Sequence, residues 1–131
     1  MTYIAAITLV VRDYDEAIRF YNDVLGFELL EDTELSPEKR WVRVAPPGQQ
    51  QFSLLLAKAK NEEETSRIGN QTGGRVGFFL HTDTFDEIYQ KLLEHKVTIV
   101  RPPEIQIYGK VCVFKDLYGN QWDLIGKNQE I

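Results

Sequence analysis

Positions 4–11 are occupied almost without interruption by apolar and small residues. Such a run predicts a β-strand covered on both faces. From Asp13 onward the apolar positions change to the spacing of one helix face, and they are Tyr14, Ala17, Ile18, Tyr21 and Leu25. Asp13, followed three residues later by Glu16, predicts a capping box at the start of this helix, and Gly26 predicts its end.

Three more apolar segments follow the helix, at 27–30, 41–45 and 52–57. Each has the length of a strand, and Pro46-Pro47-Gly48 predicts a turn before the last of them. Residues 4–57 therefore predict a βαβββ unit.

The same pattern returns later in the chain. Residues 4–22 align with residues 75–93 at a shift of 71, and Gln51–Leu55 aligns with Gln121–Ile125 at a shift of 70. Thr84 and Glu87 repeat the capping box. The second copy predicts strands at 75–82, 98–100, 111–114 and 122–125, with a turn over 116–120.

The chain is thus expected to be one α+β domain, 1–131, of two tandem βαβββ modules that form an incomplete barrel around a cleft. Module one is 4–57 and module two is 75–127. Residues 58–74 form a linker with one helical turn at 62–67.

Period-two alternation assigns the two faces of each predicted sheet. One face packs against the helix and carries Ile7, Leu9, Val11, Phe52, Leu54 and Leu56, then Phe78, Leu80, Cys112, Phe114, Trp122 and Leu124. The other face lines the cleft and carries Ala6, Thr8, Val10, Trp41, Arg43, Ser53 and Leu55, then Gly77, Phe79, His81, Val111, Val113, Asp123 and Ile125. Small residues among these aromatic and polar ones leave room for a small molecule.

Composition narrows the classes of partner. The net charge is −5, the Lys and Arg residues are scattered, and the run Glu62-Glu63-Glu64 is acidic, which argues against nucleic acid. No apolar run approaches the ~20 residues of a membrane span. The first residues do not resemble a signal peptide, and Cys112 is the single cysteine, so a cytoplasmic location without disulfides is expected.

Three motifs carry a resemblance to a known family. They are Leu9-x-Val11-x-Asp13, Phe20-Tyr21-x-x-x-Leu25-Gly26-Phe27, and Phe114-x-Asp116-x-x-Gly119-Asn120-x-x-Asp123-Leu124. With the paired βαβββ units, the chain resembles the vicinal oxygen chelate superfamily of glyoxalase, extradiol dioxygenases, and fosfomycin- and bleomycin-resistance proteins. The resemblance covers about residues 4–127 and implies a glyoxalase-like fold and a homodimer.

The resemblance also locates a metal site. Metal-binding members take His, Glu or Gln ligands from the first and last strand of each unit. The matching positions here are Ala6, Ser53, Gly77 and Asp123. Ala and Gly cannot bind a cation, a neutral Ser is a poor ligand, and one carboxylate does not hold a transition metal. We therefore expect no cofactor and no metal at the usual positions.

His81 and Asp123 are the candidate catalytic residues. His81 follows Gly77 on the cleft side, and its pKa range suits acid–base chemistry. The alternative for His81 is a hydrogen-bonded histidine near the sheet edge, or a displaced metal ligand. Asp123 needs a partner for its charge, which is either a polar ligand or an ion pair with Arg43.

The candidate ligand-binding residues are Trp41, Arg43, Ser53, Phe79 and Tyr108. Trp41 and Phe79 offer aromatic surface, although aromatic residues also serve as core. Tyr108 lies on the loop before a cleft strand, where it is a candidate lid or phenol donor.

Three hypotheses for function remain open at this point. The first is a metal-independent protein of the glyoxalase/bleomycin-resistance group that binds a small organic molecule in the cleft. The second is a lyase or dioxygenase-like metalloenzyme whose divalent metal is held by His81 and Asp123 with help from a loop or second subunit. The third is a structural or regulatory module whose cleft is filled by its own side chains.

Overall fold

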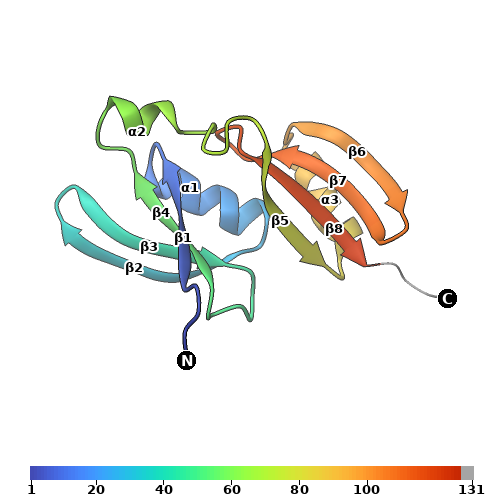
Figure 1. Cartoon of the computed structure of the whole chain (residues 1–131), viewed down its shortest axis with the longest axis horizontal. Coiled ribbons are helices and arrows are strands. Elements are labelled where there is room, and N and C mark those ends of the chain that lie inside the picture. Colours follow the sequence, from blue (N-terminus) through green and yellow to red (C-terminus); the bar gives the residue numbers. More distant parts are fainter. Residues whose placement is uncertain (128–131) are drawn as a thin grey trace. The chain divides into compact units, whose positions relative to one another are not determined.

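The structure of the chain is a computed structural model that describes residues 1–127. Two compact units divide it, one from Met1 to Ile68 and the other from Gly69 onward. In each unit a helix lies against one face of a four-stranded sheet (Figure 1). Each unit has its own core and is described by itself.

The first unit has the strand order β1-β4-β3-β2. Its strands are β1 (Ala6–Val11), β2 (Glu28–Ser36), β3 (Lys39–Ala45) and β4 (Ser53–Lys58). β1 runs parallel to β4, and the other pairs are antiparallel. The second unit repeats this topology as β5-β8-β7-β6. The predicted α+β class and the two βαβββ units are therefore confirmed, and both sheets are open.

The strands of the second unit are β5 (Val76–Thr82), β6 (Ile99–Gln106), β7 (Gly109–Lys115) and β8 (Gln121–Lys127). Its helix is α3 (Phe85–Glu94). β5 is parallel to β8, and the β6–β7 and β7–β8 pairs are antiparallel.

Two predicted strands are longer than the apolar pattern indicated. The predicted strands 27–30 and 98–100 correspond to β2 and β6, which begin at Glu28 and Ile99 and continue to Ser36 and Gln106. Both are edge strands, where backbone pairing to one neighbour continues although the side chains are polar. Hydrophobic patterning detects only the buried part of such strands.

The first helix is not one continuous α-helix. α1 (Tyr14–Arg19) passes into η1 (Phe20–Val24), a segment with π-helical hydrogen bonding. The apolar stripe is still buried, since Tyr21 is fully buried and Ala17 likewise. Gly26 ends the segment at φ +72°, as its predicted role requires.

The two predicted helix caps differ. Asp13 accepts a hydrogen bond from the Glu16 N–H at 2.9 Å, which confirms the first. Thr84 makes no side-chain cap, so the second is wrong. The Thr84 hydroxyl pairs instead with Thr82 Oγ1 at 3.1 Å, and the Thr84 N–H also donates to Thr82 Oγ1.

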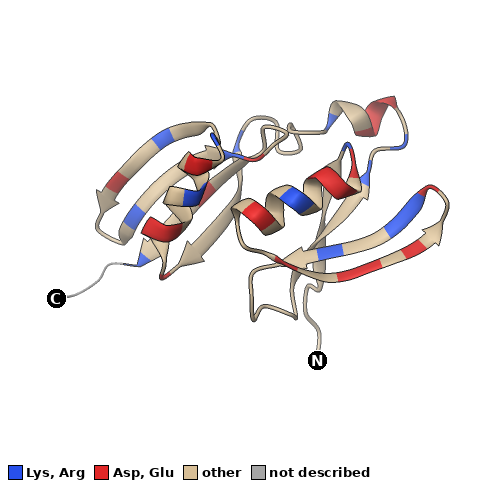
Figure 2. Cartoon of the chain, turned by 180° about the vertical axis from the view of Figure 1, so that it is seen from behind, with Lys and Arg blue, Asp and Glu red and all other residues tan. Residues whose placement is uncertain are grey.

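The first unit also contains α2 (Glu62–Ser66), where the sequence predicted a helical turn at 62–67. β2 carries acidic residues and the neighbouring β3 carries basic ones, whereas α1 and α3 carry both (Figure 2). Within residues 1–127, no helix combines the length and apolar character needed to cross a membrane.

The cores lie between each helix and its sheet. Leu9, Val11, Val42 and Leu56 are fully or almost fully buried in the first unit, although Ile7, expected with them, is 47% exposed. In the second unit the core comprises Leu92, Cys112, Phe114, Trp122 and Leu124. The Trp122 ring stacks on Phe78 at 4.6 Å between centroids. The helix therefore covers the face that alternation predicted.

Candidate functional site

The opposite, helix-free face of the first sheet carries Trp41, Arg43, Ser53, Leu55, Ala6 and Thr8. The register confirms this set, because Ala6 lies beside Ser53, and both Thr8 and Arg43 lie beside Leu55. Arg40, one residue before Trp41 on β3, points to the other side and contacts Tyr14 and Asp15. Alternation along β3 therefore places Trp41 and Arg43 away from the helix.

Arg43 is held in place by two contacts within its unit. Its Nε donates to Glu31 Oε1 at 3.0 Å, and its Nη1 donates to Ser53 Oγ at 3.2 Å. Ser53 is 1% exposed, whereas the Arg43 side chain is 28% exposed and Trp41 is 38% exposed. A fixed guanidinium and an accessible indole thus share one sheet face.

The helix-free face of the second sheet carries Phe79, His81, Val111, Val113, Asp123 and Ile125. Asp123 lies between Phe79 on β5 and Val113 on β7, and His81 lies beside Ile125. Phe79 is 62% exposed and His81 is also exposed. Alternation therefore predicted this face correctly.

Asp123 is electrostatically unusual. Its Oδ1 is buried and has no hydrogen-bond partner among the described residues. Burial raises the pKa of the Asp123 carboxyl, and the positive charges of Arg101 and His81 oppose that rise only in part. A buried carboxyl oxygen without a donor is costly, so it is a position where a ligand atom or water would find a partner.

The alternative of an Arg43–Asp123 ion pair would join residues of the two units, and it stays a prediction. The ion pair of Arg43 is with Glu31, at 3.0 Å. Glu31 follows the stretch predicted as a strand, so the sequence offered no reason to place its carboxylate beside Arg43.

The register of β5 on β8 differs from the register of β1 on β4. β5 contains an irregularity between Val76 and Phe78, and Asp123 has Phe79 as its partner. In the first unit the equivalent of Asp123, Ser53, pairs with Ala6. The second unit is therefore offset by two residues, and Gly77 is covered by Thr72, whose Cγ2 would lie 2.6 Å from an added Cβ.

The residues at the superfamily's metal positions do not fit a metal ion. Ala6 and Gly77 offer no donor atom, Ser53 Oγ already accepts from Arg43, and Asp123 is a single carboxyl with a raised pKa. Among residues 1–127, no three His, Cys, Asp or Glu side chains are grouped to hold a metal ion. Zn²⁺ and related ions require three or four protein ligands.

Tyr108 lies at the tip of the β6–β7 hairpin and is 64% exposed. It is not held beside Asp123 or Phe79 by any pairing of β6 or β7. Cys112, on the helix side of β7, is buried, and burial raises the pKa of its thiol to about 11. At neutral pH this thiol is protonated and unreactive.

The turn before β8 fixes the start of the strand that carries Asp123. Asp116, 5% exposed, accepts hydrogen bonds through Oδ1 from the backbone N–H groups of Tyr118, Gly119 and Asn120, at 2.9 to 3.0 Å. Its Oδ2 accepts from Asn120 Nδ2 at 2.9 Å. The Asp-x-x-Gly-Asn motif is thus a structural element that sets the β7–β8 connection.

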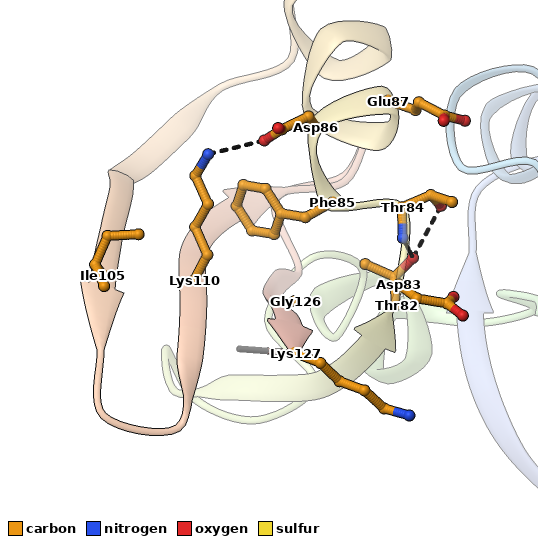
Figure 3. A pocket seen from close by; sticks show the side chains of 10 residues that line it. All are labelled: Thr82, Asp83, Thr84, Phe85, Asp86, Glu87, Ile105, Lys110, Gly126 and Lys127. Atoms are coloured by element: carbon orange, nitrogen blue, oxygen red, sulfur yellow. Dashed lines mark hydrogen bonds and ion pairs between the residues drawn. The ribbon is translucent and has the colours of Figure 1, made fainter. Parts of the chain in front are cut away.

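A hollow of about 700 Å³ lies elsewhere in the second unit, at the start of α3 (Figure 3). Lys110 crosses it, with Nζ 2.8 Å from Asp86 Oδ1 and 5.3 Å from the Phe85 ring centroid. Lys110 and Gly126 reach it from the helix side of the sheet, so the hollow is separate from Asp123 and Phe79. Sequence reasoning missed it, and the polar run Thr82-Asp83-Thr84 was its only signal.

Comparison with known proteins gives consistent matches along the chain. The profile of the Glyoxalase/Bleomycin resistance protein/Dioxygenase superfamily matches residues 3–124. An uncharacterized protein of Shewanella frigidimarina (strain NCIMB 400) is 52% identical over 128 residues, which are 97% of this chain and 95% of that protein.

Two solved structures are similar throughout. The crystal structure of UcmS2 matches with a TM-score of 0.81 and 28% identity, covering 95% of this chain and 98% of that one. TnmS3, an antibiotic binding protein from Streptomyces sp. CB03234, matches with a TM-score of 0.75 and 27% identity, covering 98% of each chain. From the profile match and these similarities, the chain belongs to the glyoxalase/bleomycin resistance protein/dioxygenase superfamily.

Proposed function

We propose that this protein binds a small organic molecule on its helix-free sheet faces, without a metal ion at the superfamily's usual ligand positions. The observation that carries the proposal is the buried Asp123 Oδ1, which lacks a hydrogen-bond donor beside the exposed Phe79 ring. Aromatic surface with a few polar groups that fix orientation is typical of small-molecule sites.

The individual roles follow from the chemistry of each side chain. Trp41 and Phe79 supply ring surface for apolar contact. Asp123, with its raised pKa, is able to donate a hydrogen bond to a ligand oxygen when protonated and to accept one when ionised. His81 offers a second titratable group near it. The similarity to the antibiotic binding protein TnmS3 supports an organic ligand of this general kind.

Tryptophan fluorescence provides a direct test. Trp41 is 38% exposed and Trp122 is 4% exposed, so a ligand on the first face should quench Trp41 selectively. We would titrate the protein with bleomycin and fosfomycin, together with a panel of aromatic antibiotics, and record fluorescence and melting temperature. We expect saturable quenching in the original protein and none in Trp41→Phe. That variant should still show the ligand-induced increase in melting temperature, because a phenyl ring keeps the apolar contact. Failure of every compound in both assays would contradict the proposal.

A second candidate is a metalloenzyme of lyase or oxygenase type that uses His81 and Asp123. The observation in its favour is that His81 is close enough to lower the pKa of Asp123 against the effect of burial. Metal analysis of protein purified without chelator separates the two candidates. Stoichiometric metal that is lost in Asp123→Ala would favour the enzyme, whereas ligand binding that survives chelator treatment would favour the binding protein.

The proposal includes a homodimer. The edge strands β2, β5 and β6 each pair with one neighbour in the sheet of their own unit, and such edges are commonly covered in proteins. Light scattering of the eluted protein would give the molar mass directly. A monomer at all concentrations would contradict this part and leave ligand binding to be judged by its own test.

A further inference from the structure

Arg43 has unused donors that point to a class of ligand. A guanidinium carries five N–H groups in a rigid fork. The contacts to Glu31 and Ser53 engage Nε and Nη1, one N–H each. The three other N–H groups have no acceptor among the described residues. They belong to a side chain that is 28% exposed, so solvent or a ligand has access to it.

The two existing contacts also fix the orientation of this group. Glu31 holds the Nε edge and Ser53, itself 1% exposed, holds Nη1. Since the fork is already ordered, little side-chain entropy remains to be lost when an acceptor binds. A fixed fork matches the planar geometry of a carboxylate better than a mobile lysine would.

Trp41 adds a second condition on the ligand, which is a ring that the indole can contact. It precedes Arg43 by two residues on β3, so the two side chains project from the same face about 7 Å apart along the strand. That spacing is comparable with the width of a fused aromatic ring system bearing one oxygen substituent. The indole would contact the ring while the guanidinium meets the substituent.

We propose that the ligand is a planar aromatic molecule with an anionic oxygen, a carboxylate or phenolate, which Arg43 recognises while Trp41 packs against the ring. This inference rests on the proposed function and adds the chemistry of the ligand. The competing explanation is that Arg43 only pairs with Glu31 to join β2 to β3. The two explanations differ in whether the ligand's charge affects its affinity.

Matched probe pairs separate these explanations. We would measure the affinity of 2-naphthoate against 2-naphthamide, and of anthraquinone-2-carboxylate against its carboxamide, by calorimetry at pH 7. The acid of each pair should bind about tenfold more tightly, as a charge-assisted hydrogen bond predicts. In Arg43→Gln the acid should fall to the affinity of the amide, while the amide changes less than about twofold.

Arg40→Gln is the matched control, because it removes one positive charge from the same strand on the helix side. It should leave the acid preference intact. If Arg43→Gln fails to fold, Arg43→Lys keeps the charge but loses the fork and should reduce the preference several-fold.

The outcomes for this inference and for the proposed function are distinguishable. Equal affinity of acid and amide, or a preference that survives in both Arg43 variants, overturns the role of Arg43 and leaves small-molecule binding standing. If a neutral antibiotic binds and neither acid does, the role of Arg43 is likewise overturned and small-molecule binding stands. Failure of all antibiotics, acids and amides to bind overturns the proposed function itself.

Discussion

Phe79 lies directly opposite Asp123 in the parallel pairing of β5 with β8. A phenyl ring offers a carboxylate no hydrogen bond, and the buried Oδ1 has no other donor among the described residues. The pair therefore combines an exposed apolar ring with a carboxyl group that is easier to protonate than an ordinary aspartate.

Asp123→Asn should stabilise the protein at neutral pH. Because burial raises the folded-state pKa of Asp123 above its unfolded value, the unfolded chain releases this proton first as pH rises. The native form therefore loses stability as pH rises from the unfolded pKa through the folded one. The amide cannot ionise, so the advantage of the variant should grow over that window and vanish below it. Urea unfolding at several pH values measures this difference.

Asp23→Asn, at an exposed carboxylate, is the control for that series and should show no comparable trend. A variant Asp123→Asn that is less stable than the original protein at pH 7, and more so as pH rises, would mean that the charged carboxylate has a stabilising partner.

Phe79→Ala should weaken ligand binding without loss of stability. The ring is 62% exposed, so its removal opens no core cavity and should change the free energy of unfolding by less than about 0.5 kcal/mol. Lost ring contact should reduce affinity for a bound aromatic compound several-fold. Leu93→Ala, at a 45% exposed position on α3, is the matched control and should leave affinity unchanged.

Gly69→Ala should be much more destabilising than Gly73→Ala. The two glycines have similar backbone angles, φ +75° and +70°. A side chain at Gly73 meets open space, whereas a Cβ at Gly69 would collide with the carbonyl oxygen of Tyr118. Gly73→Ala should cost about 1 kcal/mol for its left-handed conformation, and Gly69→Ala about 2 kcal/mol more for the collision. Equal melting temperatures would show that the 69–74 segment relaxes freely.

Asp116→Ala should be destabilising because it removes the acceptor of three backbone N–H groups at once. We expect a loss of about 3 kcal/mol in the free energy of unfolding. Asp116→Asn keeps one oxygen for those groups but sets an amide NH₂ against Asn120 Nδ2, so its loss should be smaller. Equal losses for the two variants would mean that charge, rather than the number of hydrogen bonds, determines the stability of this turn.

Alternation and repetition predicted the faces of both sheets well. They placed Arg43 on the same face as Leu55, and Asp123 on the same face as Val113, and in the observed register each of these pairs lies side by side. The reason is that burial of one face imposes a strict period of two on each strand. The repeat of residues 4–22 at residues 75–93 also predicted a second helix, and the structure places it at Phe85–Glu94.

Contacts that do not depend on burial were not predictable in this way. Glu31 lies on an exposed edge strand, so nothing in the apolar pattern indicated that it would bind Arg43. The two-residue offset that sets Phe79 beside Asp123 was not predictable, because it leaves the apolar pattern unchanged. The hollow near Lys110 arises where the start of α3 meets the ends of four strands, β5, β6, β7 and β8, which no single segment of sequence reveals.

The offset at Gly77 has a consequence for how far the two units are equivalent. An offset of one residue would turn a strand inside out, but an offset of two preserves which side chains are buried. It nevertheless gives every following residue of β5 a different neighbour on β8. Ser53 therefore lies beside a small residue, Ala6, whereas Asp123 lies beside a phenyl ring, so the two units share a topology but could not exchange these strands and keep the same neighbours.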